Sequence, residues 1–146
     1  MIRAGRPDEA SVIHDVVCAA YRHYIPRIGK PPGPMLDDYA RRIAAGEVWA
    51  LEEAGQIVGM LVLEEAQAGF VLDNIAVLPE CQGKGYGRAL LQFAEAEALR
   101  RRYREIHLYT HALMTENFAL YRRIGYAETR RITENGYDRI YMSKHL

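Results

Sequence analysis

The chain has 146 residues, of which 49% are hydrophobic and 26% are charged. That length is typical of one domain, residues 1–146, whose core needs neither disulfides nor a structural metal. The 19 basic and 19 acidic residues cancel, so no overall field draws the chain to nucleic acid or to an anionic membrane. The longest apolar run, Ile57–Leu63, is too short to cross a bilayer. We therefore expect a cytoplasmic protein with no nucleic-acid or membrane partner.

Apolar residues at helical spacing predict a first helix that starts near Pro7. Its buried stripe is expected to comprise Ile13, Val16, Val17, Ala20, Tyr21 and Tyr24. A proline-rich loop, Pro26–Pro34, leads to a short second helix, Leu36–Ala45, which ends at Gly46. The composition of this loop is typical of a lid or a connector rather than of a domain boundary.

The rest of the chain alternates between strand and helix patterns. Three antiparallel strands are predicted at Val48–Glu52, Ile57–Glu65 and Phe70–Val77. They are followed by a long helix Gly85–Arg102, a strand Ile106–Thr110 and a helix Thr115–Ile124. Asn135-Gly136, a strong hairpin signal, predicts a final pair of strands at Tyr126–Thr133 and Tyr137–Lys144. With a strand before the first helix, this order predicts an α/β or α+β fold, a mixed and mostly antiparallel sheet of six to seven strands with helices on both faces.

Three alternating glycines, Gly83, Gly85 and Gly87, lie where a predicted strand gives way to the long helix. Residues without Cβ let backbone N–H groups approach a ligand, and a helix N-terminus adds partial positive charge. Lys84 and Arg88 add local charge. The segment therefore predicts an anion cradle that would suit a pyrophosphate; a flexible turn is the alternative.

Two common nucleotide-binding loops do not fit this segment. A Walker loop needs Ser or Thr directly after its Gly-Lys pair, and Lys84-Gly85 offers none in that register. A dinucleotide fingerprint needs G-x-G-x-x-G and an acid about twenty residues on, but the next strand ends in Tyr109-Thr110-His111.

The pattern Gln-x-x-Gly-x-Gly, formed by Gln82, Gly85 and Gly87, follows a strand that ends in Val-x-Pro. Here the sequence resembles the GNAT superfamily of acyl-CoA-dependent N-acetyltransferases. The resemblance continues through Asn117 and Tyr121, an Asn-x-x-x-Tyr helix followed by Gly125 and an aromatic residue. It covers the chain from about Val48 to the C-terminus and extends to the predicted order of elements.

The resemblance implies an acetyl-CoA site. The amides between Gln82 and Gly87 would bind the pyrophosphate, and the strand Ile75–Val77 would pair with the pantetheine arm, as an added strand does. That pairing requires this strand to splay from the strand Ile106–Thr110. The residues expected to hold the cofactor are Ile75, Ala76, Val77, Gln82, Gly83, Lys84, Gly85, Tyr86, Gly87, Arg88 and Asn117.

The resemblance also implies that Tyr121 lies near the thioester sulfur. A phenol with a pKa near 10 is protonated at neutral pH and can donate a proton to the leaving thiolate. Tyr121 and Asn117 are four residues apart, which places them on one helix face. Without the resemblance, the sequence would favour an ordinary packed aromatic residue at Tyr121.

The base that accepts the amine's proton is less evident. Asp73 is the first candidate, and strand alternation predicts that it and Asn74 point to opposite faces. Glu64 and Glu65 are second and His111 is third. No metal is expected, because His107 and His111 would lie roughly 13 Å apart along a strand.

The acceptor is expected to be a primary amine, of a small molecule or of a peptide, that attacks the thioester directly in a ternary complex. An α-amine is easier to use than a lysine, whose neutral form costs roughly 4 kcal/mol at neutral pH. Residues available for the acceptor walls are Tyr21, Tyr24, Arg27, Tyr39, Arg130, Tyr137 and Tyr141. The alternative function is a non-catalytic acyl-CoA-binding or regulatory module, which has no need of Tyr121. The final hairpin is a possible homodimer interface.

Overall fold

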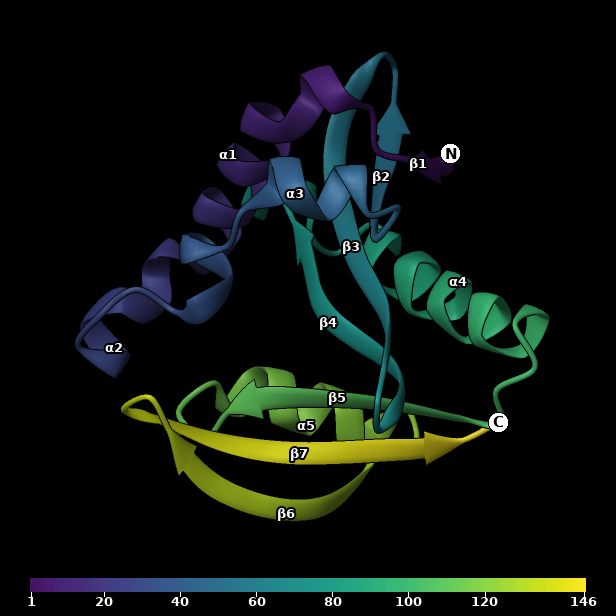
Figure 1. The fold of residues 1–146 in the computed structure, drawn as a ribbon. Helices are drawn as coiled ribbons and strands as arrows, with labels where there is room; N and C mark the ends of the chain where they lie inside the picture. The colour runs from purple at the N-terminus through teal and green to yellow at the C-terminus, as the bar shows by residue number, and fades with distance from the viewer.

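The computed structural model describes residues 1–146. A seven-stranded sheet in the order β1-β2-β3-β4-β5-β7-β6 forms its centre (Figure 1). The strands are β1 (Ile2–Ala4), β2 (Val48–Glu53), β3 (Gln56–Ala66), β4 (Gly69–Val77), β5 (Glu105–His111), β6 (Ala127–Glu134) and β7 (Tyr137–His145). The helices are α1 (Ala10–Tyr21), α2 (Ile25–Ile28), α3 (Tyr39–Ala44), α4 (Tyr86–Arg100) and α5 (Thr115–Arg123). All strand pairs are antiparallel except β4 with β5. The predicted mixed, mostly antiparallel sheet is confirmed.

Helices cover both faces of the sheet, and two hydrophobic clusters separate along this division (Figure 1). Strand alternation in β3 produces the division: Leu61 and Leu63 pack in the cluster that includes α4, whereas Met60 and Val62 pack in the cluster that includes α1. Because both faces are covered, β3 is a nearly continuous apolar run. None of the helices combines the length and the apolar character needed to cross a bilayer.

All six residues of the predicted buried stripe are buried. The α-helix itself is shorter than predicted, because Pro7–Glu9 and Arg22–Tyr24 are 3₁₀ turns on either side of α1. The second helix is shorter than the sequence indicated. Asp38 caps it, because its side chain accepts a hydrogen bond of 3.1 Å from the amide of Arg41, so α3 begins only at Tyr39. The preceding Gly33–Leu36 is a separate 3₁₀ turn.

The strands β4 and β5 separate soon after they meet. They pair only at Phe70 with Ile106 and at Val71 with His107. On its other edge, β4 pairs with β3, and β5 pairs with β7. Past Val71 and His107 the facing edges of β4 and β5 therefore diverge (Figure 1). The splayed central strands are therefore confirmed.

A β-bulge lies at Asp73, just past the separation. Val62 of β3 is opposite Asn74, but the next residue, Leu63, is opposite Leu72, which leaves Asp73 as the extra residue of β4. A bulge allows two successive side chains to turn toward the same side. Asp73 and Asn74 both contact side chains of α3, so the prediction that they point to opposite faces is wrong.

Candidate functional site

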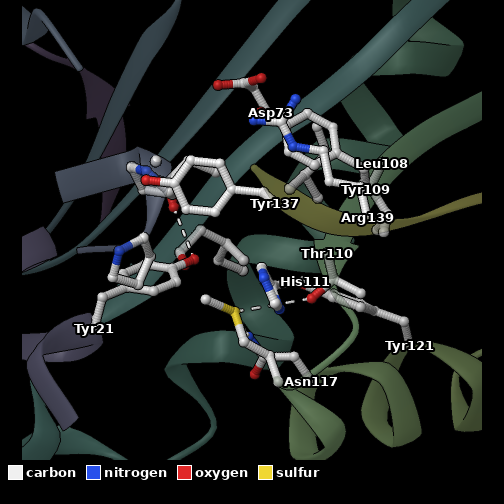
Figure 2. A pocket seen from close by; sticks show the side chains of 17 residues that line it. Tyr21, Asp73, Leu108, Tyr109, Thr110, His111, Asn117, Tyr121, Tyr137 and Arg139 are labelled. Atoms are coloured by element: carbon white, nitrogen blue, oxygen red, sulfur yellow. Dashed lines mark hydrogen bonds between the residues drawn. The ribbon is translucent and has the colours of Figure 1, made fainter. Parts of the chain in front are cut away.

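Two cavities meet between the separated strands. The first, called here the glycine-loop groove, is lined by β4, the glycine loop, α1 and α5, including Ala76, Val77, Gln82, Gly83 and Gly87. The second, called here the tyrosine cavity, encloses about 570 Å³, mouth included, and is lined by β4, β5, β7 and the loop Pro32–Pro34 (Figure 2). Both cavities are lined by the same four residues at their junction, which are Tyr21, Ile75, Asn117 and Tyr121.

The glycine loop presents a row of free backbone amides. None of the amides of residues 83–88 donates a hydrogen bond within the protein. Gly83 and Gly85 have φ of 81° and 86°, the left-handed region that favours glycine, and Gly85 directly precedes α4. A Cβ at Gly83, Gly85 or Gly87 would meet nothing within 4 Å. The loop is thus an open cradle at a helix N-terminus, with the chemistry of an anion site.

Side chains around the cradle have separate roles. Gln82 donates from Nε2 to the carbonyl of Val77 at 3.2 Å and so ties the loop to the end of β4. Lys84 and Arg88 are exposed and make no ion pair, so both can reach an anion. Tyr86 is partly buried against the core around α4, and its amide is one of the free amides of the loop.

The inner edge of β4 offers backbone groups to the groove. Leu78 donates its amide to Val58 of β3 at 2.9 Å, and in an antiparallel ladder every second residue faces the partner strand. The peptide groups of Ala76 therefore face β3, and those of Ile75 and Val77 face the groove. The carbonyl of Ile75 accepts from the hydroxyl of Tyr21 at 3.0 Å and that of Val77 accepts from Gln82, so these two residues offer their amides, while Ala76 contributes a side chain to the wall.

Tyr121 projects from α5 to the junction of the cavities (Figure 2). Only 6% of the residue is exposed, its ring meets Tyr126 edge to face at 5.8 Å, and its hydroxyl has no hydrogen-bond partner in the protein. Burial raises the pKa of Tyr121 above its ordinary value, so the phenol stays protonated. The junction therefore presents an uncommitted O–H donor.

Asp73 lines the tyrosine cavity at the end opposite Asn117 and Tyr121 (Figure 2). Its Oδ2 accepts a hydrogen bond of 3.0 Å from Nη2 of Arg42, which also binds three other carboxylates, those of Asp37, Glu47 and Glu64. Burial raises the pKa of Asp73 to about 6, against the opposing effect of Arg42. A carboxylate with this pKa can accept a proton near neutral pH.

The other two candidates for the base are less suited. Glu64 is bound to Arg42 and Glu65 faces Arg101 at 3.5 Å, and neither lines the tyrosine cavity. His111 lines it, but Nδ1 accepts the amide of Leu113 at 3.0 Å, so in the neutral ring Nε2 carries the proton. Burial lowers the pKa of His111 and favours that neutral form. His111 is thus placed as a hydrogen-bond donor.

A hydrogen-bond chain that the sequence did not predict links β4 to the loop before α3. Tyr21 donates to Oδ1 of Asn74 at 2.9 Å, Asn74 donates from Nδ2 to the hydroxyl of Tyr39 at 2.9 Å, and Tyr39 donates to the carbonyl of Pro34. The only signal in the sequence was a polar Asn74 within an apolar strand. Tyr109 and Arg139, which also line the cavity, carried no such signal.

The match to a family model identifies the family of this chain. Residues 44–128, more than half of the chain, match the family model of the acetyltransferase (GNAT) domain. No curated protein matches the sequence at a significant level. The solved structure of PaiA N-acetyltransferase from Thermoplasma acidophilum in complex with coenzyme A is similar, with 17% identity, 100% of this chain and 98% of that chain covered, and a TM-score of 0.82.

Two further solved structures share the fold. The ribosomal-protein-S18-alanine N-acetyltransferase of Escherichia coli is 22% identical over 99% of this chain and 92% of that chain, with a TM-score of 0.75. The IAA acetyltransferase of Bacillus cereus is 21% identical over 100% of this chain and 99% of that chain, with a TM-score of 0.73. At these identities the likeness establishes the fold and leaves the acceptor open.

Proposed function

We propose, because the chain belongs to the GNAT family of acetyltransferases, that it transfers the acetyl group of acetyl-CoA to a primary amine by direct attack in a ternary complex. One observation carries this proposal: the glycine-loop groove and the tyrosine cavity meet at Tyr121. Two substrates that approach from the two cavities would bring their reacting atoms to the same point. Holding both in reacting geometry supplies much of the rate of such a transfer.

The chain's own residues fit coenzyme A. The free amides of residues 83–88 and the exposed Lys84 and Arg88 suit its phosphates. The amides of Ile75 and Val77 suit the pantetheine arm, which would extend the sheet where β5 has diverged. Asn117 lies at the junction with Tyr121, on the same side of α5.

Tyr121 is proposed to stabilise the leaving sulfur. Its hydroxyl has no partner in the protein, so it can donate to the sulfur as negative charge develops there. Burial opposes formation of a tyrosinate, but the same desolvation makes a buried thiolate more basic. The proton is therefore held at the phenol oxygen until the thiolate forms and then passes to sulfur, and the tyrosinate that remains regains a proton from water as the products leave.

Asp73 is proposed to receive the proton of the attacking amine. It lies at the far end of the tyrosine cavity from Tyr121, so the proton would pass through water rather than by direct contact. The carboxylate is the conjugate base above a pH of about 6. Its bond to Arg42 leaves Oδ1 free to accept.

Turnover of acetyl-CoA with a panel of primary amines tests the proposal, with release of free thiol as the readout. We expect thiol release that depends on the amine and falls in Tyr121→Phe, while coenzyme A still binds. A protein that binds coenzyme A tightly and acetylates no primary amine would instead be the non-catalytic binding module.

A further inference from the structure

The loop Gly29–Leu36, called here the lid, forms one wall of the tyrosine cavity. It contributes Pro32, Gly33 and Pro34 to the lining. A Cβ at Gly33 would lie 3.9 Å from Nη2 of Arg139, so the lid reaches β7 across the cavity. Proline fixes φ at three of its eight positions, Pro31, Pro32 and Pro34, which makes the segment stiff.

The lid is fastened to the β6–β7 hairpin by two hydrogen bonds between segments 106 residues apart. Tyr137 donates from its hydroxyl to the carbonyl of Pro31 at 2.7 Å. Lys30 donates from Nζ to the carbonyl of Gly136 at 2.7 Å, and the same Nζ lies 4.1 Å from the centre of the Tyr137 ring. The hairpin tip thus holds the lid closed over the cavity.

The opposite side of the lid is fastened to the helices. Tyr39 of α3 donates to the carbonyl of Pro34, and His14 of α1 is bonded through Nε2 to the carbonyl of Met35 at 2.9 Å. The lid is therefore bonded on two flanks. An acceptor that extends from the cavity through the wall formed by the lid would have to displace it from at least one of these anchors.

The remaining walls are also held in place. The guanidinium of Arg139 lies 4.6 Å from the centre of the Tyr109 ring, and its Nη1 is bound to Glu134 at 2.8 Å. Most of the lining apart from Asp73 and Arg139 is apolar or aromatic. The lining residues come from strands, helices and the lid at once, as in most small-molecule sites.

We infer that the acceptor is a compact small-molecule amine with an apolar body, enclosed beneath the lid, and that the two bonds from the β6–β7 hairpin exclude peptide N-termini. This inference rests on the proposed acetyl transfer and names its acceptor class. It assigns Lys30 and Tyr137 as specificity-determining residues. Neither needs to touch the reacting atoms, because each acts through the position of the lid.

Matched acceptors separate size from amine chemistry. Each apolar amino acid of a set is offered in two forms, as its free amide and as the N-terminal residue of a hexapeptide. The reacting α-amine is then the same in both forms. For the wild type we expect kcat/KM for the amide to exceed that for the hexapeptide by roughly a hundredfold. This corresponds to losing two or three hydrogen bonds when the lid is displaced.

The double variant Lys30→Met with Tyr137→Phe removes both bonds and keeps most of each side chain's bulk. We expect it to reduce the preference for the amide about tenfold, mainly through a lower KM for the hexapeptide. Coenzyme A affinity, measured by calorimetry, should stay within twofold of wild type, because the substitutions leave the glycine loop unchanged. An unchanged affinity also shows that the double variant is folded. The matched control is Lys144→Met, which removes a bond to Glu95 at the end of β7 away from the hairpin tip and should leave the preference unchanged.

Three results would overturn the inference. The wild type could use hexapeptides as well as amides. The double variant Lys30→Met with Tyr137→Phe could bind coenzyme A normally and keep the full preference, or the control Lys144→Met could lose the preference equally. A protein that acetylates neither form of any acceptor, and no simple alkyl or arylalkyl amine, would overturn the proposed function itself.

Discussion

Replacing Gly87 tests the cofactor cradle, because stability and affinity should move in opposite directions. Gly87 lies in the first turn of α4 with ordinary helical backbone, and a Cβ there meets no protein atom within 4 Å. Gly87→Ala should therefore raise the free energy of unfolding by about 0.5–1 kcal/mol, by restricting the unfolded chain. The same methyl projects toward the groove and should weaken coenzyme A binding about tenfold, as overpacking does.

A charged side chain at this position enlarges the loss. A carboxylate about 4 Å from a phosphate, at an effective dielectric constant near 20, repels it by about 4 kcal/mol, which is about a thousandfold in affinity. Gly87→Glu should thus abolish measurable binding. The matched control is Gln92→Glu, which adds one negative charge at an exposed position of the same helix, away from the groove.

Calorimetric titration with coenzyme A and urea unfolding supply the two measurements. Gly85→Ala offers a contrast, because its φ of 86° is strained for alanine and the variant should lose about 1 kcal/mol of stability instead of gaining it. The cradle assignment is refuted if Gly87→Ala and Gly87→Glu are both folded and bind coenzyme A like wild type.

Three further predictions address catalysis and stability. Tyr121→Phe should lower kcat by about 10²–10⁴ with coenzyme A affinity nearly unchanged, and equal steady-state rates would contradict the assigned role. Burial raises the pKa of Asp73 to about 6 and only the carboxylate accepts a proton, so kcat/KM should fall as pH drops through about 6. Asp73→Asn should be slower and should lose this pH dependence. A fall near pH 6 that persists in the variant would show that another group accepts the proton. Arg100 and Arg101 lower the pKa of Glu97 to about 2, so its stabilisation is present above its ordinary pKa and lost as pH falls toward 2. Glu97→Gln should cost about 1 kcal/mol at pH 7 in urea unfolding, since exposed Arg100 is screened, and no cost at pH 7 would contradict this.

The features of the glycine loop are local, and that is why the sequence indicated them. Gly83, Gly85 and Gly87 lie within five consecutive residues at the start of a helix, so their backbone freedom and the helix dipole act over a few ångströms. The Asn117–Tyr121 pair spans one helical turn, and the family resemblance, not its spacing alone, implied its role. The buried stripe of α1 follows from its 3.6-residue period.

The acceptor side was predicted poorly, because its geometry depends on contacts between distant segments. Strand alternation alone misplaced Asp73 relative to Asn74, since a bulge arises from the pairing of two strands. The tautomer of His111 depends on the amide of a following turn. Nothing local to Arg139 indicates that it lies against the lid.

Residue types and short spacings by themselves therefore determined that this chain forms a mixed sheet with a glycine-rich helix start and places a tyrosine one turn from an asparagine. The tertiary structure alone decided three features. It set where β4 and β5 separate, it turned Asp73 and Asn74 to the same side of β4 through the bulge, and it bound the loop after α2 to a hairpin 106 residues away. The reason is physical: local conformational preferences act between near neighbours in the chain, whereas the shape of the acceptor site depends on which distant surfaces are brought into contact.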